Sequence, residues 1–255
     1  MIKYDYKYVY FGGQLMQIKV VENYEEMSLE AAKILSDIVK NKPDCVLGLA
    51  TGSTPIGLYD CLVKECAAGE LDFSTVRTVN LDEYYPISPD NEQSYRYFMN
   101  ENLFDRVNIN KANTYVPNGK AEDVQAFCEE YEKLIDELGG TDVQVLGIGK
   151  NGHIGFNEPA DVLDPNTHLT GLTASTIEAN ARFFDSEDDV PKHAITMGIR
   201  SIFKARKIVI LANGEGKADA IKAMLSGIST SCPASLLCLH PDVVVICDKA
   251  AYSKV

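Results

Sequence analysis

Several sequence signatures are missing from this chain. No run of apolar residues is long enough to span a bilayer, and the first residues, MIKYDYKYVYFGG, have neither the apolar core nor the cleavage site of a signal peptide. There is no CxxC pair and no HExxH, and the four histidines are far apart in sequence. We therefore expect a cytoplasmic protein without a membrane partner, a metal or another cofactor.

Basic residues are also scarce. The chain has 24 Lys and Arg against 37 Asp and Glu, which gives a formal net charge of −13 at pH 7. Nucleic acids and acidic membranes both require a basic patch, so this balance argues against either partner. A small anionic substrate remains compatible with it, because a few local donors are enough to hold such a ligand.

The length and the pattern of the chain indicate one domain. Its 255 residues suffice for a sizeable core, and strand and helix patterns alternate nearly from end to end over residues 16–255. Residues 1–15 differ, with four tyrosines and one phenylalanine among charged residues, and they are a tag, an upstream start or an edge hairpin. The seven cysteines are odd in number and scattered, mostly in apolar runs, so we expect buried free thiols.

From residue 16 onward, apolar runs alternate with apolar residues at helical spacing. The runs indicate strands at residues 17–21, 45–50, 76–81, 143–148, 194–198, 207–211 and 243–247. The helical spacing indicates helices at residues 24–42, 56–66, 94–104, 124–138 and 173–184. This order predicts an α/β fold with a doubly wound, mostly parallel sheet and helices on both faces, a Rossmann-like three-layer sandwich.

Residues 145–159, VLGIGKNGHIGFNEP, join an apolar strand to a glycine-rich turn and polar side chains. Open α/β sheets bind ligands at the carboxyl ends of their strands, and this turn brings His153 and Glu158 to such an end. A neutral imidazole can transfer protons near pH 7, and a nearby carboxylate fixes its tautomer and stabilises its charged form. The alternative, a histidine that is simply a satisfied polar residue in a turn, stays open.

A second turn, Thr51-Gly52-Ser53-Thr54-Pro55, follows the strand at 45–50. The free N–H groups of a helix amino terminus, the hydroxyls of Ser53 and Thr54 and the backbone of Gly52 suit a bound monophosphate. In the alternative, Ser53 or Thr54 is an ordinary helix cap and Pro55 takes the first helical position. The turn lacks GxxxxGK[ST] and GxGxxG, so neither a nucleoside triphosphate nor a dinucleotide is indicated.

Further charged residues lie at element ends. Asp82 and Glu83 follow the strand at 76–81, where a carboxylate is well placed as a general base, although acidic residues also end strands in solvent. Lys217 stands in the first turn of a helix, where the dipole disfavours a cation unless an anion is bound, or else it is a solvated lysine. Arg182, near the end of its predicted helix, either clamps an anion or satisfies helix-terminal carbonyls.

A phosphate cradle, a carboxylate and a histidine-glutamate pair at three strand ends suit a phosphorylated sugar that undergoes proton transfer without a cofactor. From Met16 onward the sequence resembles the glucosamine-6-phosphate deaminase family, whose members convert glucosamine 6-phosphate to fructose 6-phosphate and ammonia. The matching motifs, in matching order, are GLATGSTPIGLY, NLDEYYPI, SYRYFMNENLF, GIGKNGHIGFNEP, LTASTIEANARFF and LHPDVVVICD.

The resemblance implies a role for each candidate residue. Asp82 matches the family's enolisation base, which moves a proton from C2 to C1 of the open-chain amino sugar. His153 matches the group that opens the ring by proton transfer at the ring oxygen, and Asn151 and Glu158 match the residues that accompany it. The residues that match the ligands of the substrate phosphate are Gly52, Ser53, Thr54, Arg182 and Lys217.

The chain departs from the family pattern in two places. Many members have Asp where this chain has Asn151, and a neutral amide can orient the histidine but cannot stabilise its charged form, so Glu158 must do this alone. Allosterically activated members have basic residues in the segment aligned with 167–171, where this chain has His168, Leu169 and Thr170, and they have a longer tail. We therefore expect an enzyme without allosteric activation, either a monomer or a homo-oligomer.

Two other functions remain open from the sequence. A 6-phosphogluconolactonase resembles this fold and binds a sugar phosphate, but it hydrolyses a lactone and needs no base at C2. A sugar-phosphate sensor binds without turnover, but such regulators normally carry a DNA-binding module. Here only a stretch of about 45 residues, acidic overall and with one predicted helix, precedes the phosphate cradle.

Overall fold

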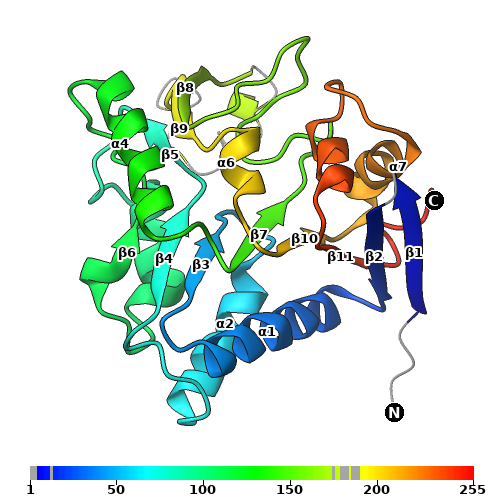
Figure 1. The fold of residues 1–255 in the computed structure, drawn as a ribbon, viewed down its shortest axis with the longest axis horizontal. Coiled ribbons are helices and arrows are strands. Elements are labelled where there is room, and N and C mark those ends of the chain that lie inside the picture. The colour runs from blue at the N-terminus through cyan, green and yellow to red at the C-terminus, as the bar shows by residue number, and fades with distance from the viewer. Residues whose placement is uncertain (1–4, 12–13, 174–175, 179–183, 185–189) are drawn as a thin grey trace.

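The computed structural model describes residues 5–11, 14–173, 176–178, 184 and 190–255. An eight-stranded sheet crosses the molecule in the order β1-β2-β11-β10-β7-β3-β4-β6, with helices around it (Figure 1). The pairs from β2 to β6 are parallel and β1 is antiparallel to β2, which confirms the predicted mostly parallel α/β fold. Its strands are β1 (Asp5–Phe11), β2 (Gln14–Val21), β3 (Val46–Leu49), β4 (Arg77–Asn80), β6 (Thr114–Tyr115), β7 (Val143–Gly147), β10 (Ile208–Ala212) and β11 (Val243–Asp248).

The core lies on both faces of this sheet. Every residue of β3, β10 and β11 is buried, as expected for parallel strands covered on both sides. Asn23 and Asp123 cap the two longest helices, each by accepting from a backbone N–H three residues on. The helices are α1 (Tyr24–Asn41), α2 (Ile56–Ala67), α3 (Tyr95–Met99), η1 (Asn100–Phe104), η2 (Lys111–Asn113), α4 (Val124–Glu137), α6 (Ile199–Phe203), η4 (Glu215–Lys217), α7 (Ala218–Ser226) and η5 (Pro233–Leu239).

A second sheet has three antiparallel strands in the order β5-β9-β8, of which only β9 corresponds to a predicted strand, at 194–198. They are β5 (Asp82–Tyr85), β8 (His168–Gly171) and β9 (His193–Thr196). The chain leaves the main sheet after β4, and β5 begins two residues later with Asp82, which pairs with Thr196. The second sheet therefore fixes Asp82 just beyond the carboxyl end of a main-sheet strand.

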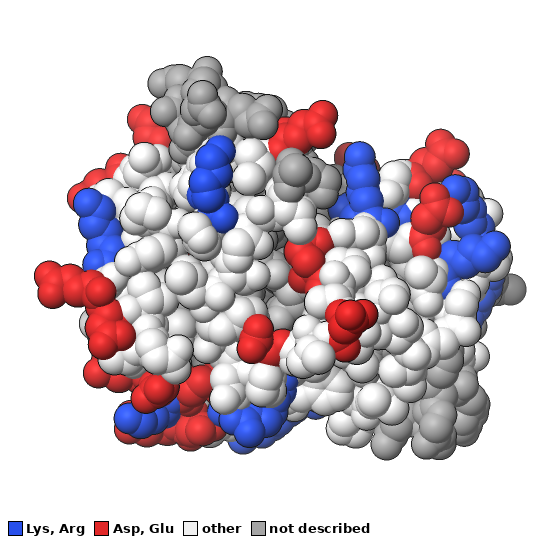
Figure 2. Space-filling model, turned by 90° about the horizontal axis from the view of Figure 1, so that it is seen from above, with Lys and Arg blue, Asp and Glu red and all other residues white. Residues whose placement is uncertain are grey.

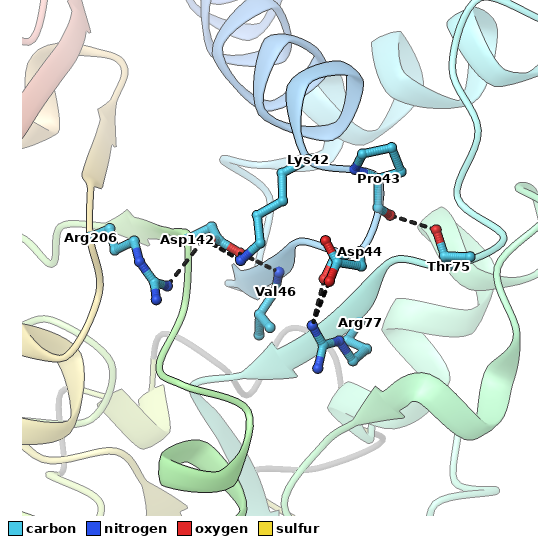
Figure 3. A network of polar contacts seen from close by, with 8 residues as sticks. All are labelled: Lys42, Pro43, Asp44, Val46, Thr75, Arg77, Asp142 and Arg206. Atoms are coloured by element: carbon cyan, nitrogen blue, oxygen red, sulfur yellow. Dashed lines mark hydrogen bonds and ion pairs between the residues drawn. The ribbon is translucent and has the colours of Figure 1, made fainter.

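Polar contacts join the amino ends of the main strands (Figure 3). Asp142, directly before β7, accepts from the Val46 N–H at 2.8 Å and from Lys42 Nζ at 2.8 and 2.9 Å, and it lies 3.1 Å from Arg206 Nη1. Arg77, the first residue of β4, donates to the carbonyl of Asp44 in the loop between α1 and β3. This network holds the strand ends opposite to those that carry the predicted site.

Residues 5–11 form β1 at the edge of the main sheet, an arrangement that agrees with the edge hairpin among the interpretations of residues 1–15. The seven cysteines are free thiols, as predicted, although Cys61 and Cys66 are only half-buried. On the face shown in Figure 2, Lys and Arg side chains are interspersed with Asp and Glu. No helix within the described ranges is both long and apolar enough to cross a membrane.

Candidate active site

The loop after β7 turns back on itself, and its glycines make this possible. The Gly149 N–H donates to the His153 carbonyl at 2.9 Å, and the Gly152 N–H donates to the Gly149 carbonyl at 3.0 Å. Gly152 and Gly155 have φ values of +84° and +56°, in the left-handed region that side chains other than glycine rarely adopt. The loop thus returns residues 153–158 to the carboxyl end of β7.

The imidazole of His153 lies directly against Gly149. A Cβ at Gly149 would overlap three atoms of the ring, so glycine is the residue that leaves room for this histidine. From the sequence alone, Gly149 has no predicted role beyond the turn. The available signal is its place four residues before the candidate histidine in GIGKNGH.

His153 and Glu158 face each other across this loop. His153 Nδ1 lies 3.2 Å from Glu158 Oε1. The Asn151 amide donates to the other carboxylate oxygen, Oε2, at 2.6 Å, and its own oxygen accepts from the His153 backbone N–H at 3.2 Å. Asn151 therefore fixes the carboxylate and the loop backbone, and it orients the imidazole through them rather than by a direct contact.

Glu158 is ionised near neutral pH. Burial raises its pKa, but the hydrogen bond and charge of His153, together with hydrogen bonds from Thr176 and Asn151, outweigh burial and lower the pKa to about 2. A permanent negative charge beside Nδ1 favours a proton on that nitrogen and stabilises the imidazolium. Nε2 is then the nitrogen that can exchange a proton with a substrate.

Asp82 is buried beside the same loop, with 6% of its surface exposed. A Cβ at Gly155 would lie 3.4 Å from Asp82 Oδ2 and 2.9 Å from Thr196 Oγ1, so the missing side chain leaves space next to the carboxyl group. Burial, with the charge of the adjacent Glu83, raises the pKa of Asp82 to about 8. A carboxyl group with such a pKa is a far stronger base than one in water.

Glu83, in contrast, supports the protein. Its carboxylate accepts from the backbone N–H groups of Tyr84, Tyr95 and Arg96 at 2.8 to 2.9 Å, and it thereby holds the amino terminus of α3. Burial raises the pKa of Glu83 to about 7 in spite of these three donors. The predicted carboxylate pair thus divides into a candidate base and a helix-capping residue.

The turn before α2 provides no side-chain cap for the helix. Pro55 is the N-cap of α2, and no side chain caps this helix, so the alternative in which Ser53 or Thr54 is the cap is wrong. The reason is that the Tyr24 hydroxyl donates to the Ser53 carbonyl at 3.1 Å and accepts from the Gly57 N–H at 2.8 Å. Neither hydroxyl is therefore used to cap α2.

Lys217 brings a cation to the same edge of the sheet. It is the N-cap of α7, and its Nζ donates to the carbonyl of Ile148, just beyond β7, at 2.6 Å. β3 and β7 are neighbours in the sheet, so the turn after β3, where Gly52 has a φ of +88°, belongs to this edge as well. Burial lowers the pKa of Lys217, and the charge of Lys150 lowers it further. A bound dianion would relieve both effects.

Arg182 lies outside the described residues, so its place in the phosphate site stays a prediction. Earlier in the same segment, Thr176 Oγ1 donates to Glu158 Oε1 at 2.7 Å. Thr176 is not among the residues predicted from the sequence, although it stands in LTASTIEANARFF. Among the residues that the structure describes, no group of three or more His, Cys, Asp or Glu side chains could hold a metal ion.

Comparisons with known proteins identify relatives of this chain. Residues 21–245 match the family described as glucosamine-6-phosphate isomerases/6-phosphogluconolactonase. The glucosamine-6-phosphate deaminase of Clostridium perfringens is 57% identical over 237 residues, which cover 92% of this chain and 98% of that protein. The glucosamine-6-phosphate deaminase of Thermoanaerobacter pseudethanolicus is 54% identical over 239 residues, 93% of this chain and 94% of that protein.

Solved structures show the same relation. A monomeric glucosamine-6-phosphate deaminase superposes with a TM-score of 0.91 at 46% identity, over 93% of this chain and 99% of that one. The 6-phosphogluconolactonase of Thermotoga maritima, at 21% identity and a TM-score of 0.72 over 92% of this chain and 100% of that one, shares the fold. The chain therefore belongs to the family of glucosamine-6-phosphate isomerases and 6-phosphogluconolactonases.

Proposed function

We propose that the protein is a glucosamine-6-phosphate deaminase, which converts glucosamine 6-phosphate and water to fructose 6-phosphate and ammonia. The observation that carries the proposal is the position of Asp82. This buried carboxyl group, with a pKa raised to about 8, adjoins Gly155, two residues beyond His153 in the same loop. A cytoplasmic location suits its free thiols, which stay reduced there.

Ring opening is the task of His153. The carboxylate of Glu158 keeps a proton on Nδ1, so Nε2 accepts the proton of the C1 hydroxyl and returns a proton to the ring oxygen as the C1–O5 bond breaks. Glu158 compensates the charge of the transient imidazolium. The product is the open-chain aldehyde, whose C2 still carries the amino group.

Asp82 then isomerises the open chain. Its carboxylate takes the proton from C2 while O1 gains a proton, so that an enol forms across C1 and C2. The carboxyl group then gives its proton to C1, and the nitrogen on C2 releases one proton, which balances the proton gained by O1. The C2–N bond is now the double bond of an imine, which water hydrolyses to the ketone of fructose 6-phosphate and ammonia. The proposed holders of the substrate phosphate are the turn at Gly52, Ser53 and Thr54, with Lys217 and Arg182.

The first experiment measures ammonia and fructose 6-phosphate from glucosamine 6-phosphate in excess chelator. We expect both products from the wild type and a loss of about 10²- to 10⁴-fold in kcat with Asp82→Asn. Asp90→Asn, a change of the same kind at an exposed residue, is the matched control and should keep full activity. An Asp82→Asn variant as active as the wild type would remove Asp82 from the mechanism.

The lactonase alternative is tested by isotope transfer and by its own substrate. In heavy water, a base that exchanges its proton with solvent places deuterium at C1 of the ketose product, whereas lactone hydrolysis leaves no such label. Hydrolysis of 6-phosphogluconolactone without ketose formation would establish the lactonase. Binding of glucosamine 6-phosphate without either product would favour the sensor.

We further propose that the enzyme is a monomer without allosteric activation. In the segment at 167–171, His168 Nδ1 lies 2.8 Å from the Asn166 carbonyl and Leu169 is exposed, so this strand offers no cluster of cations to a second sugar phosphate. Rates plotted against substrate concentration should be hyperbolic, and light scattering should give about the mass of one chain. A sigmoidal curve that N-acetylglucosamine 6-phosphate makes hyperbolic would contradict the proposal.

A further inference from the structure

The segment after β8 reaches the His153–Glu158 pair through one hydroxyl. Thr176 is buried, and its Oγ1 donates to Glu158 Oε1 at 2.7 Å. The same oxygen lies 3.2 Å from His153 Nδ1, whereas Oε2 accepts from Asn151. The carboxylate is thus held at both oxygens, once from its own loop and once from a segment farther along the chain.

Capping of the helical turn at 176–178 does not account for this contact, because Thr173 has that task. Thr173 Oγ1 accepts from the Thr176 N–H at 3.2 Å, and its carbonyl accepts from the Ile177 N–H at 2.9 Å. Thr173 Oγ1 also donates to Thr176 Oγ1 at 2.9 Å. This donation occupies the acceptor side of the Thr176 hydroxyl and leaves its proton directed at Glu158.

We propose that Thr176 is a positioning residue for ring opening: its hydroxyl, aligned by Thr173, holds Glu158 Oε1 toward His153 Nδ1. The inference rests on the proposed deaminase function. A carboxylate fixed at both oxygens cannot rotate away when the imidazole gains or loses its charge. The proton on Nδ1 therefore stays in place, and Nε2 keeps its aim at the sugar ring through each turnover.

The charge state of Glu158 agrees with this role. Burial alone would raise the pKa of Glu158, and the hydrogen bond from Thr176 is one of the interactions that lower it to about 2. Without this donor the pKa rises, and Asn151 remains as the side-chain donor beside the imidazole. The loss is therefore visible in the carboxylate itself, independently of catalysis.

The kinetic test separates ring opening from the later proton transfer. With Asp82→Asn as background, NMR exchange between the α and β anomers of glucosamine 6-phosphate reports enzyme-catalysed ring opening alone. Adding Thr176→Val should slow this exchange about 10- to 100-fold, the order of loss expected from a misdirected catalytic group. Thr176→Ser should restore it. Thr170→Val on β8, a matched change of a half-buried threonine, is the control and should leave the exchange unchanged.

A second measurement needs no activity. In the free enzyme with labelled glutamate, Thr176→Val should raise the pKa of Glu158 in a carboxyl NMR titration, whereas Thr176→Ser should keep it low. In the otherwise native enzyme, Thr176→Val should lower kcat while KM changes less than about twofold, because the phosphate contacts are elsewhere.

A folded Thr176→Val protein with wild-type anomer exchange and an unchanged Glu158 titration would overturn the inference. The same holds if Thr176→Ser is as slow as Thr176→Val, because the shape of the side chain and not its hydroxyl would then matter. If the wild type forms no fructose 6-phosphate, the proposed function fails, and the Glu158 titration still decides the role of Thr176.

Discussion

At the scale of single residues, Asp82 can act as a base only after it loses its proton. Because burial and the charge of Glu83 raise its pKa to about 8, most free enzyme molecules carry this proton at pH 7. We expect kcat/KM to increase with pH and to reach half its limit near pH 8, since kcat/KM reports the free enzyme. Initial rates at low substrate between about pH 6 and 10 measure this. If kcat/KM instead rose in the pH range where an ordinary carboxyl group titrates, Asp82 would not be the group responsible.

Gly149 is the residue on which the position of His153 depends. A methyl group there would displace the imidazole, so Gly149→Ala should lower kcat/KM by about 100-fold while the protein still folds, since Gly149 has no positive φ. Gly171→Ala is the matched control, because a Cβ at Gly171 meets nothing within 4 Å. Circular dichroism and thermal melts establish folding. Equal activity of the two variants would mean that the ring is not placed by Gly149.

At the scale of elements, β5 delivers two neighbouring carboxyl groups with different tasks. Glu83→Gln removes the charge that helps to raise the pKa of Asp82, so the rise of kcat/KM should move to lower pH and the rate at pH 7 should increase. One fewer acceptor at α3 should lower the free energy of unfolding by about 1 kcal/mol. The pH profile and urea unfolding of the variant measure the two effects. A pH profile identical to that of the wild type would contradict the coupling.

The sequence predicts most strands of the main sheet because they have a local signal. Buried parallel strands are continuous apolar runs, and α1 and α4 each have an apolar face and a side-chain cap. The two-residue strand β6 is not predicted, and in the second sheet only β9 matches a predicted strand, at 194–198. Residues 82–85, DEYY, directly follow the apolar run at 76–81 that predicts β4. Their partner strand, β9, lies more than 100 residues farther along the chain. Pairing at that distance depends on tertiary packing, which local spacing does not encode.

The candidate site likewise contains some residues that a local sequence signal predicts and others that it does not. His153, Glu158 and Asn151 are neighbours in sequence, and the structure places them in contact as the motif indicates. Thr176 and Gly149 were missed for different reasons. Thr176 reaches Glu158 from 18 positions away, and no periodicity marks that contact. Gly149 acts by having no side chain, and only the position of the imidazole reveals what a side chain would disturb.

At the scale of the whole molecule, the Asp142 network holds the strand ends opposite the site. Burial raises the pKa of Asp142, but the interactions with Lys42, the Val46 N–H and Arg206 outweigh burial and hold the pKa below that of an ordinary aspartate. A carboxyl group whose pKa is lower in the folded than in the unfolded protein stabilises the folded state at pH values above the unfolded pKa. This stabilisation is lost as the pH falls through the folded pKa. The network should therefore stabilise the folded protein near neutral pH and lose this effect in acid.

Asp142→Asn tests this contribution. We expect the free energy of unfolding to decrease by about 1–2 kcal/mol near pH 7, because the partners Lys42 and Arg206 are partly exposed, and by less near pH 3. Urea unfolding at the two pH values measures the change. Because the network is remote from the predicted site, kcat/KM at 25 °C should stay within about twofold of the wild type. A constant deficit at both pH values would assign the loss to packing rather than to charge.

The pairing of β2 with β11 has a consequence for how the chain folds. Beyond the paired strands, the Lys249 N–H donates a hydrogen bond to the Val21 carbonyl. The Lys249 side chain also forms an ion pair with Glu22, which lies 227 positions earlier in the chain. The β1–β2 hairpin needs only local contacts, whereas β11 must cross most of the chain to reach it, which is slow. Until it arrives, one edge of β2 is open to strands of other molecules. The yield of refolding should therefore fall as protein concentration rises, with the arrival of β11 as the competing step.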